Sequence, residues 1–424
     1  MKSIQKRRYL MESEAYRKEN DTYLHFSRRM FGTVFSAGLL GILTGCQIEN
    51  VDTQIQLEDK LHALFNSDPV PGGLSAAVVR GETLVWSGGI GQADIDAKLA
   101  MTSDHIQNIG SISKTITATA VMQLWEEGAF ELDDDINEFL PFSIRNPNFP
   151  DKPITFKQLL AHRSSIKDGT SYEKSYACGD PSVSLSDWIQ GYFSHDNDFY
   201  DLNDNFHTWS PGTINPPKSP RVYSNVGYGV LGLLVEHITG ELFSDYCQKR
   251  IFIPLQMKNT GWYLSEIDQS RHTKLYSNVS MSVRVQHLAE EGLKKSQSNG
   301  DVYPHCLYSF YNYPDGLLRT NVKDLSRFLR AYINDGKLDG VQILDKNTID
   351  LMLSDQHFGR GLCWGTDGEG LWGHGGGDPG VATYMAFTTK EDLGVIILSN
   401  NGDFRNYLSE IESILFESLR QQDT

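Results

Sequence analysis

The chain of 424 residues lacks several motifs that often point directly to a function. It has no run of about 18 apolar residues, so we predict no transmembrane helix. Its five cysteines form no C-x-x-C pair, which disfavours a zinc site and a thiol redox motif. The H-E-x-x-H motif of zinc peptidases and the G-x-S-x-G motif of α/β-hydrolases are also missing. These absences argue against a metallopeptidase, a redox protein and an α/β-hydrolase.

Basic residues are scarce relative to acidic ones, since 38 Lys and Arg stand against 54 Asp and Glu for a net charge of −16. The first 46 residues contribute +4, because they hold 8 basic and 4 acidic residues, which leaves −20 for the remainder. A body this acidic repels a polyanion, so we do not expect nucleic acid as a partner.

The basic N-terminus, residues 1–46, has the order of an export signal. Residues 27–31 (Ser-Arg-Arg-Met-Phe) resemble a twin-arginine motif, and a mildly apolar stretch follows over 32–43. Leu-Thr-Gly-Cys then resembles a lipoprotein cleavage box with Cys46 as the lipidated residue. A basic tail with a chance cysteine is the alternative. We expect an exported protein on the periplasmic side, lipid-anchored to a membrane through Cys46, and to the outer membrane if the host is Gram-negative.

Four cysteines remain once Cys46 is set aside. In an exported protein they can form two disulfides in any of three pairings, and four buried thiols are an equally good interpretation. The sequence does not decide between these alternatives. The residues concerned are Cys178, Cys247, Cys306 and Cys363.

Predicted strands lie near both ends of the chain, and predicted helices and loops lie between them. Short segments joined by turns predict strands over 74–79, 83–86, 382–388 and 393–398. Helical spacing predicts helices over 52–66, 115–127, 227–238, 321–333 and 406–419. We therefore expect an α/β (α+β) fold, in which an antiparallel β-sheet flanked by helices is built from both ends of the chain and carries a mostly helical insertion.

The expected boundaries follow from the same pattern. A single hydrolase domain covers residues 47–424. Its sheet subdomain takes about 52–135 and 315–424, and the helical and loop insertion takes about 136–314.

Ser111 and Lys114 stand one helical turn apart where the helix over 115–127 begins, which places both side chains on one face. A serine hydroxyl is a poor nucleophile until a neighbour takes its proton. A lysine can do so if desolvation and nearby cations lower its pKa. Ser111 taken alone is better explained as the N-cap of a core helix than as a catalytic residue. The same spacing recurs without an apolar helix behind it at Ser3, Ser164 and Ser171.

Two later segments complete a possible site. Tyr223 and Asn225 precede the helix over 227–238. A tyrosine hydroxyl near an ammonium is stabilised as phenolate and can transfer protons, while an asparagine amide can hold a lysine and bind a substrate carbonyl. The run His-Gly-Gly-Gly at 374–377 enters a predicted strand, where glycines let a ligand lie against the backbone. A backbone N–H there can pair with that of Ser111 as an oxyanion hole.

In this order, the three motifs resemble the serine β-lactamase and penicillin-binding-protein superfamily over roughly residues 55–420. Tyr223 in the second motif resembles the branch of class C β-lactamases, D-alanyl-D-alanine carboxypeptidases, related esterases and D-amino-acid peptidases. His374 in the third motif is more similar to carboxypeptidases and aminopeptidases than to class C β-lactamases, which carry lysine. Gly375 departs from the Thr or Ser common in the family, and the missing hydroxyl weakens recognition of a substrate carboxylate.

The resemblance implies hydrolysis through an acyl-enzyme that needs neither a metal nor an organic cofactor. Ser111 is the expected nucleophile, and Lys114 and Tyr223 move its proton. The N–H groups of Ser111 and Gly377 form the expected oxyanion hole. The residues expected to bind substrate are Asn225, His374 and Gly376.

We therefore expect a serine hydrolase of amide or ester bonds, similar to a D-alanyl-D-alanine carboxypeptidase, a D-amino-acid peptidase or an esterase. The expected partner is a small peptide, ester or β-lactam, with cell-wall peptide among the candidates. One alternative is a β-lactamase that hydrolyses β-lactam antibiotics. Another is a non-catalytic, lipid-anchored protein that binds or senses the cell wall, although a lost serine or a signalling span, which would favour it, is not seen.

Overall fold

The computed structural model describes residues 46–67, 70–201, 204–213, 222–278, 288, 302–356 and 359–421. The twin-arginine-like and apolar parts of the predicted export signal lie outside these residues. Cys46 is the first residue of helix α2 (Cys46–Ser67), and its lipidation stays a prediction. Within the described ranges, every helix is too short or too polar to cross a bilayer.

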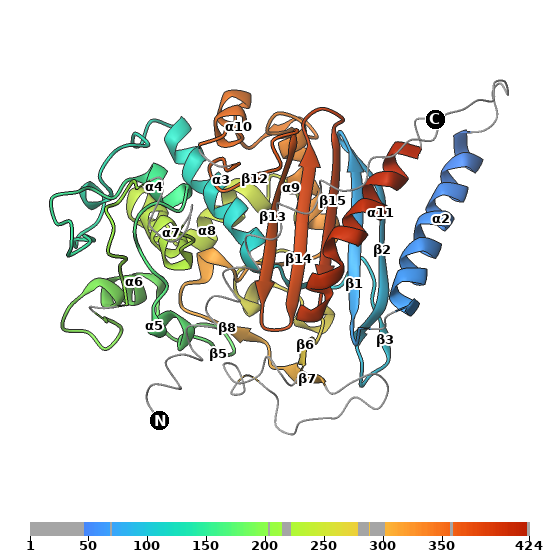
Figure 1. Ribbon diagram of the computed structural model, residues 1–424, viewed down its shortest axis with the longest axis horizontal. Helices are drawn as coiled ribbons and strands as arrows, with labels where there is room; N and C mark the ends of the chain where they lie inside the picture. The colour runs from blue at the N-terminus through green and yellow to red at the C-terminus, as the bar shows by residue number, and fades with distance from the viewer. Residues whose placement is uncertain are drawn as a thin grey trace.

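A seven-stranded antiparallel sheet forms the centre of the molecule, in the order β12-β13-β14-β15-β1-β2-β3 (Figure 1). The N-terminal strand β1 pairs with the C-terminal strand β15, with Val78 opposite Val395, so the two ends of the chain close one sheet. This confirms the predicted fold class. The strands are β1 (Gly73–Arg80), β2 (Thr83–Asp94), β3 (Leu99–Ala100), β12 (Gly365–Thr366), β13 (Leu371–Asp378), β14 (Val381–Thr388) and β15 (Leu393–Ser399).

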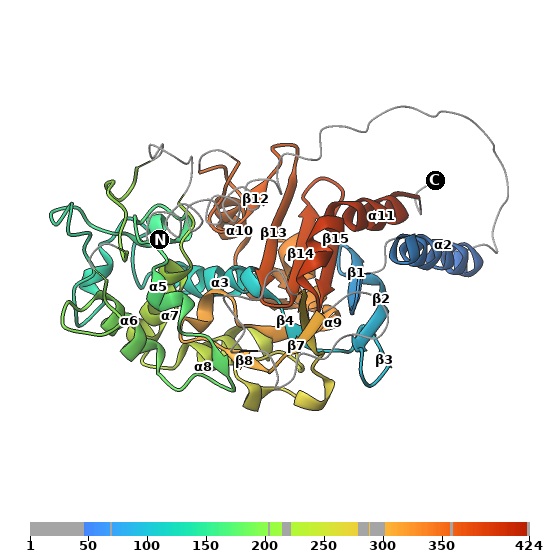
Figure 2. The same ribbon diagram turned by 60° about the horizontal axis from the view of Figure 1, so that its bottom comes forward.

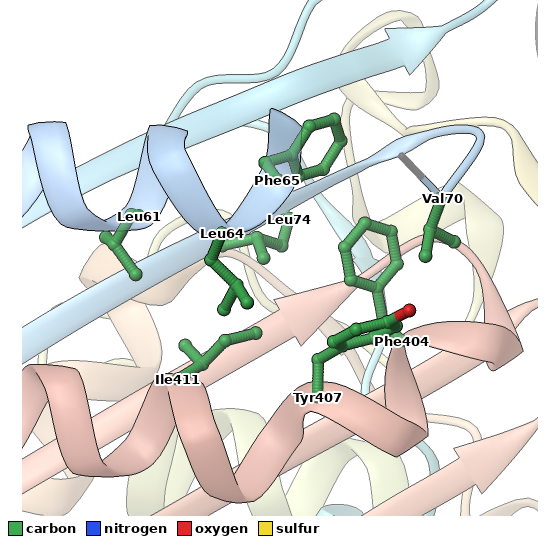
Figure 3. A pocket seen from close by; sticks show the side chains of 8 residues that line it. All are labelled: Leu61, Leu64, Phe65, Val70, Leu74, Phe404, Tyr407 and Ile411. Atoms are coloured by element: carbon green, nitrogen blue, oxygen red, sulfur yellow. The ribbon is translucent and has the colours of Figure 1, made fainter. Parts of the chain in front are cut away.

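Helices cover both faces of this sheet (Figures 1 and 2). The terminal helices α2 and α11 (Leu408–Arg420) lie side by side on one face. Helix α9 (Val322–Ile333) packs on the other face against β1 and β15. Between α2 and α11 is an apolar pocket (Figure 3). It is lined by Leu61, Leu64, Phe65, Val70, Leu74, Phe404, Tyr407 and Ile411.

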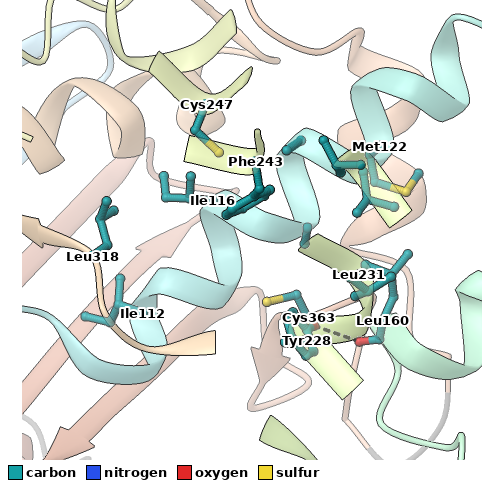
Figure 4. Close-up of a cluster of buried hydrophobic side chains, with 14 of the residues drawn as sticks. Ile112, Ile116, Met122, Leu160, Tyr228, Leu231, Phe243, Cys247, Leu318 and Cys363 are labelled. Atoms are coloured by element: carbon teal, nitrogen blue, oxygen red, sulfur yellow. Dashed lines mark hydrogen bonds between the residues drawn. The ribbon is translucent and has the colours of Figure 1, made fainter. Parts of the chain in front are cut away.

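A mostly helical part packs beside β13 around the buried helix α3 (Ser113–Glu126) (Figures 1 and 4). Nearly every side chain of α3 is buried, since the helix is surrounded by its neighbours. The boundaries predicted for the insertion stay a prediction. The other helices are α4 (Phe156–Leu160), α5 (Thr170–Glu173), α6 (Leu185–Phe193), α7 (Asn225–Thr239), α8 (Phe243–Cys247) and α10 (Lys346–Met352).

Short strand pairs lie outside the seven-stranded sheet. They are β4 (Gln107–Asn108) with β9 (Arg319–Thr320), β5 (Ala177–Cys178) with β8 (Tyr308–Ser309), β6 (Leu275–Asn278) with β7 (Val302–His305), and β10 (Lys337–Leu338) with β11 (Val341–Gln342). Short 3-10 turns include η2 (Gly110–Ile112), η9 (Tyr313–Asp315) and η10 (Gly402–Tyr407).

The four cysteines form one disulfide, and the other two stay unpaired with each other. The predictions of two disulfides and of four thiols are therefore both wrong. Pairing of β5 with β8 brings the Cα atoms of Cys178 and Cys306 to 5.7 Å, and the two form a disulfide. Cys247 and Cys363 are not disulfide-bonded and are buried at separate places in the apolar cluster around α3 (Figure 4).

Candidate active site

A sharp backbone turn presents Ser111 to the edge of the sheet. Gly110 has φ = +55°, a conformation that favours glycine. A Cβ on Gly110 would lie 2.8 Å from the backbone nitrogen of Gly377. Ser111 follows in η2, and the chain continues directly into α3. The glycine therefore lets the start of the helix approach β13 closely, which puts Ser111 beside the strand that carries Gly377.

Lys114 lies at the centre of the polar contacts. Its side chain is fully buried, and Nζ lies 3.1 Å from Ser111 Oγ and 2.7 Å from Asn225 Oδ1. Nζ also donates to the backbone oxygen of Asp315 at 2.7 Å and lies 3.4 Å from its Oδ2. The predicted residues Ser111, Lys114 and Asn225 are thus brought together from two distant segments.

Two aromatic rings enclose the lysine amine. Nζ lies 4.9 Å from the centre of the Tyr223 ring. It lies 5.6 Å from the ring of Tyr228. The Tyr223 ring stacks on His162 at 4.2 Å, and His162 Nδ1 also accepts from the backbone N–H of Ser224, at 3.2 Å. Tyr223 is therefore held beside Lys114 by the stacking of its ring on His162.

The surroundings of Lys114 do not favour the lowered pKa that the sequence analysis named as the condition for a lysine base. Burial by itself lowers this pKa, but the electrostatic interactions with Tyr223, Asp315 and Asp168 outweigh burial and raise it above the usual value. Lys114 is therefore an ammonium at neutral pH. The sequence analysis considered desolvation and missed the buried carboxylates, which come from segments far from Lys114 in the chain.

Asp168 is a positioning residue that the sequence analysis did not identify. Its carboxylate accepts from Asn225 Nδ2 and the Val226 N–H, each at 2.9 Å, and from Ser224 Oγ at 3.3 Å. These bonds hold the start of α7 and turn the Asn225 amide so that its oxygen faces Lys114. No local pattern marks Asp168, which lies 57 residues before Asn225 in a polar loop.

Asp315 is a second buried carboxylate beside Lys114 to which the sequence analysis gave no role. It makes an ion pair with Lys114, and its carboxylate accepts from Tyr172 Oη at 3.0 Å and Asn312 Nδ2 at 2.9 Å. Burial raises the pKa of Asp315 although Lys114 opposes the shift. The ion pair between Asp315 and Lys114 holds the lysine amine next to Ser111.

The third motif lies along one edge of β13. In the described part of the chain, β12 pairs only with Trp372 and Gly373, so the edge from 374 to 378 opposite β14 has no strand beside it. Gly376 has no room for a side chain, since a Cβ would lie 2.2 Å from the oxygen of Ile109. His374 is buried, and its Nδ1 lies 2.7 Å from the oxygen of Gly375.

The expected oxyanion-hole groups are neighbours in space, since Gly377 N faces Gly110, the residue before Ser111. The described residues include no group of three or more His, Cys, Asp or Glu side chains arranged to hold a metal. Serine, lysine, tyrosine and asparagine around a glycine-rich strand can support acyl transfer to a serine.

An antiparallel sheet flanked by helices, with this arrangement at its edge, defines the class of hydrolases with the serine β-lactamase and penicillin-binding-protein fold. The family model described as Beta-lactamase matches residues 66–414, and the chain belongs to that family. The predicted resemblance is therefore confirmed.

Relatives agree with this membership. Protein flp of Staphylococcus aureus (strain MRSA252) is 23% identical over 352 residues, 82% of this chain and 63% of its own length. The chain thus spans less than two thirds of that relative. Penicillin-binding protein 4 of Amycolatopsis lactamdurans is 25% identical over 84% of this chain and 87% of its own. The structure of D-amino acid amidase from Ochrobactrum anthropi SV3 is similar in fold, with a TM-score of 0.65, 22% identity and coverage of 89% of this chain and 100% of its own.

Proposed function

We propose that the protein is a serine hydrolase that cleaves amide or ester bonds through an acyl-enzyme formed on Ser111. The observation that carries this proposal is the 3.1 Å contact between Lys114 Nζ and Ser111 Oγ, beside the edge of β13. A protein that only binds or senses the cell wall would have no need of this contact, which makes that alternative weaker.

The proton of Ser111 passes to Tyr223 in this proposal. A phenolate is stabilised by the ammonium of Lys114, which contacts both Tyr223 and Ser111. Lys114 can relay the proton by giving one to the phenolate while it takes one from the serine. This differs from a mechanism in which a neutral lysine is the base, because Asp315 and Asp168 keep Lys114 charged.

The remaining groups stabilise the reacting acyl group. The N–H groups of Ser111 and Gly377 are placed to bind the oxyanion, and each such donor contributes about 3–4 kcal/mol to transition-state stabilisation. Asn225 orients Lys114 and can donate its amide to the substrate. The proton on Tyr223 then goes to the leaving group, and water releases the acyl group from Ser111. None of these steps uses a metal or an organic cofactor.

A D-amino-acid peptidase, a D-alanyl-D-alanine carboxypeptidase or an esterase is the proposed activity. Similarity in fold to a D-amino acid amidase and in sequence to a penicillin-binding protein supports this range. Gly375 has no hydroxyl to hold a substrate carboxylate, which favours the peptidase that acts on a free amino terminus and the esterase over the carboxypeptidase.

The test is labelling and turnover in Ser111→Ala. We expect this variant to lose fluorophosphonate labelling and all hydrolysis of short esters and D-alanine anilides, because the nucleophile is gone. Ser171→Ala is the matched control, since Ser171 has the same spacing to a lysine without these contacts, and it should keep both signals. Turnover by Ser111→Ala contradicts the proposal. With labelled penicillin, a long-lived adduct on Ser111 indicates a peptidase, and rapid turnover indicates a β-lactamase.

We also propose export and lipid anchoring at Cys46. The Cys178–Cys306 disulfide supports an oxidising compartment, because structural disulfides are rare in the cytosol. Cys46 begins α2, so a lipid there would tether the sheet domain through the helix that packs beside α11.

A further inference from the structure

Asp378 is the last residue of β13 and directly follows Gly377, whose N–H belongs to the proposed oxyanion hole. Residues along a strand are about 3.4 Å apart, so Asp378 lies one step beyond the position of the acyl oxygen. Side chains alternate between the faces of a sheet. Gly376 faces Ile109 near Ser111, so Asp378 faces the same way, whereas a Cβ on Gly377 would meet Arg405.

The carboxylate of Asp378 is held rigidly but is not satisfied. Oδ1 accepts from Tyr176 Oη at 2.8 Å. Oδ2 is buried, and no described residue gives it a hydrogen bond of ordinary geometry. The nearby Tyr308 hydroxyl donates instead to the oxygen of Pro379, at 2.9 Å. A buried acceptor without a donor is costly, so the structure provides a position at which a ligand donor would be favourable.

No cation of the described chain pairs with Asp378, since none of the ion pairs formed by the described residues includes it. Lys114 and Arg319 are near enough to act on it electrostatically, but Lys114 is bound to Asp315 and Arg319 Nη2 donates to the oxygen of Tyr308 at 2.7 Å. Asp168 adds a third carboxylate near Lys114. This side of the site therefore attracts a positive group and repels a carboxylate.

We propose that Asp378 selects substrates by binding a free α-ammonium group, so that amides or esters of amino acids with an unblocked amino terminus are preferred. The inference rests on the proposed acyl transfer to Ser111. With the acyl oxygen in the oxyanion hole, the α-carbon of the substrate lies next along the strand edge, and its ammonium comes within reach of Oδ2. An ammonium has three N–H donors and a positive charge, and an acylated amine has one donor and no charge.

The experiment compares D-alanine p-nitroanilide with its N-acetyl derivative, at pH 7.5, on the full chain without its export signal. The measured quantity is the ratio of the two kcat/KM values. We expect the wild type to prefer the free amine. Asp378→Asn should lower the ratio about 10- to 100-fold, mainly through KM, as expected for loss of a hydrogen bond between charged groups.

Two control variants separate this role from structural damage. Asp392→Asn removes an exposed carboxylate in the turn at the other end of β14, and the ratio should not change. Tyr176→Phe removes the hydrogen bond to Oδ1 but keeps the carboxylate, and most of the preference should remain. If Tyr176→Phe lowers the ratio as much as Asp378→Asn does, Asp378 only positions Tyr176 and the inference is wrong.

Further outcomes of this comparison would contradict the inference about Asp378. A wild type that prefers the acetylated substrate, or an unchanged ratio in Asp378→Asn, overturns the inference while Ser111→Ala still tests the hydrolase itself. If neither anilide is cleaved, D-alaninamide and its N-acetyl form are compared as inhibitors of fluorophosphonate labelling of Ser111. Equal inhibition by both forms is then the contradicting result.

The pH profile provides a second readout. Burial, followed by the charge of Asp315, raises the pKa of Asp378 to about 7, and Tyr176, Tyr308 and Lys114 oppose this shift. Arg319 and Tyr172 also interact electrostatically with this carboxylate. The preference should grow as pH rises through about 7, where the carboxylate ionises, and fall above about 8, where the α-amino group loses its proton. Asp378→Asn should remove the rise.

Discussion

At the scale of residues, Lys114 shows how buried charges set the chemistry. An isolated buried amine loses its proton readily, but this one contacts Ser111, Asn225, Tyr223 and Asp315. The ion pair and the aromatic rings offset the cost of burial. The amine therefore serves as a fixed positive charge between a hydroxyl and a phenol.

At this scale we predict that the ionisation of Asp168 controls activity at acid pH. Burial raises its pKa to about 6 while its bonds to Asn225 and Val226 oppose the shift. The ionised carboxylate accepts from Asn225, so kcat/KM should fall as pH drops through about 6. Asp168→Asn should lower kcat/KM about 10- to 100-fold, since it loses a charged acceptor, and should remove this acid limb. The measurement is kcat/KM for a neutral ester between pH 4.5 and 8, with Asp392→Asn as the control. An acid limb that survives in Asp168→Asn excludes this role.

At the scale of elements, the β5–β8 pair bounds the site because its residues reach the end of β13. Tyr176 precedes β5 and contacts Asp378, and Tyr308 in β8 donates to Pro379. The disulfide closes a loop of 128 residues between the two strands. A cross-link across so long a loop restricts the unfolded chain strongly.

We predict that replacing both cysteines by serine, in a Cys178→Ser/Cys306→Ser variant, lowers the free energy of unfolding by about 2–5 kcal/mol. Urea denaturation followed by tryptophan fluorescence measures it. Adding a reductant should destabilise the wild type by a similar amount and leave the double variant unaffected. An equal midpoint for both proteins without reductant would show that the cross-link contributes nothing.

At the scale of the whole molecule, the sheet is closed by its two ends, and the proposed anchor lies at the start of α2. The chain beyond the signal carries a net charge of −20, which favours solubility once the tether is absent. The domain that follows residue 46 should therefore depend on the proposed lipid at Cys46 for membrane attachment.

Cys46→Ala tests this dependence. In cells that export the protein, the wild type should sediment with membranes and need detergent for extraction. The variant should appear in the soluble exported fraction, with its Ser111 still labelled by a fluorophosphonate. Labelling with a radioactive fatty acid should be seen only in the wild type. Membrane attachment of the variant equal to that of the wild type rules out the anchor.

The sequence predicted the large elements well, because each has a local cause. Short, mostly apolar segments next to turns predicted β1 and β14, and a helical segment with Asn321 as its N-cap predicted α9. The fold class followed from the strands at both ends and was confirmed. The cysteines were not predictable, since their pairing depends on β5 and β8, two strands of two residues each.

The groups proposed to react could be named from the sequence itself, because Ser111, Lys114, Tyr223 and Asn225 stand in short motifs with a fixed local geometry. The charge state of Lys114 and the preference we assign to Asp378 were decided only by the tertiary structure. Electrostatic interactions depend on distance and burial in space, and the carboxylates of Asp168, Asp315 and Asp378 reach the lysine only after the chain has folded.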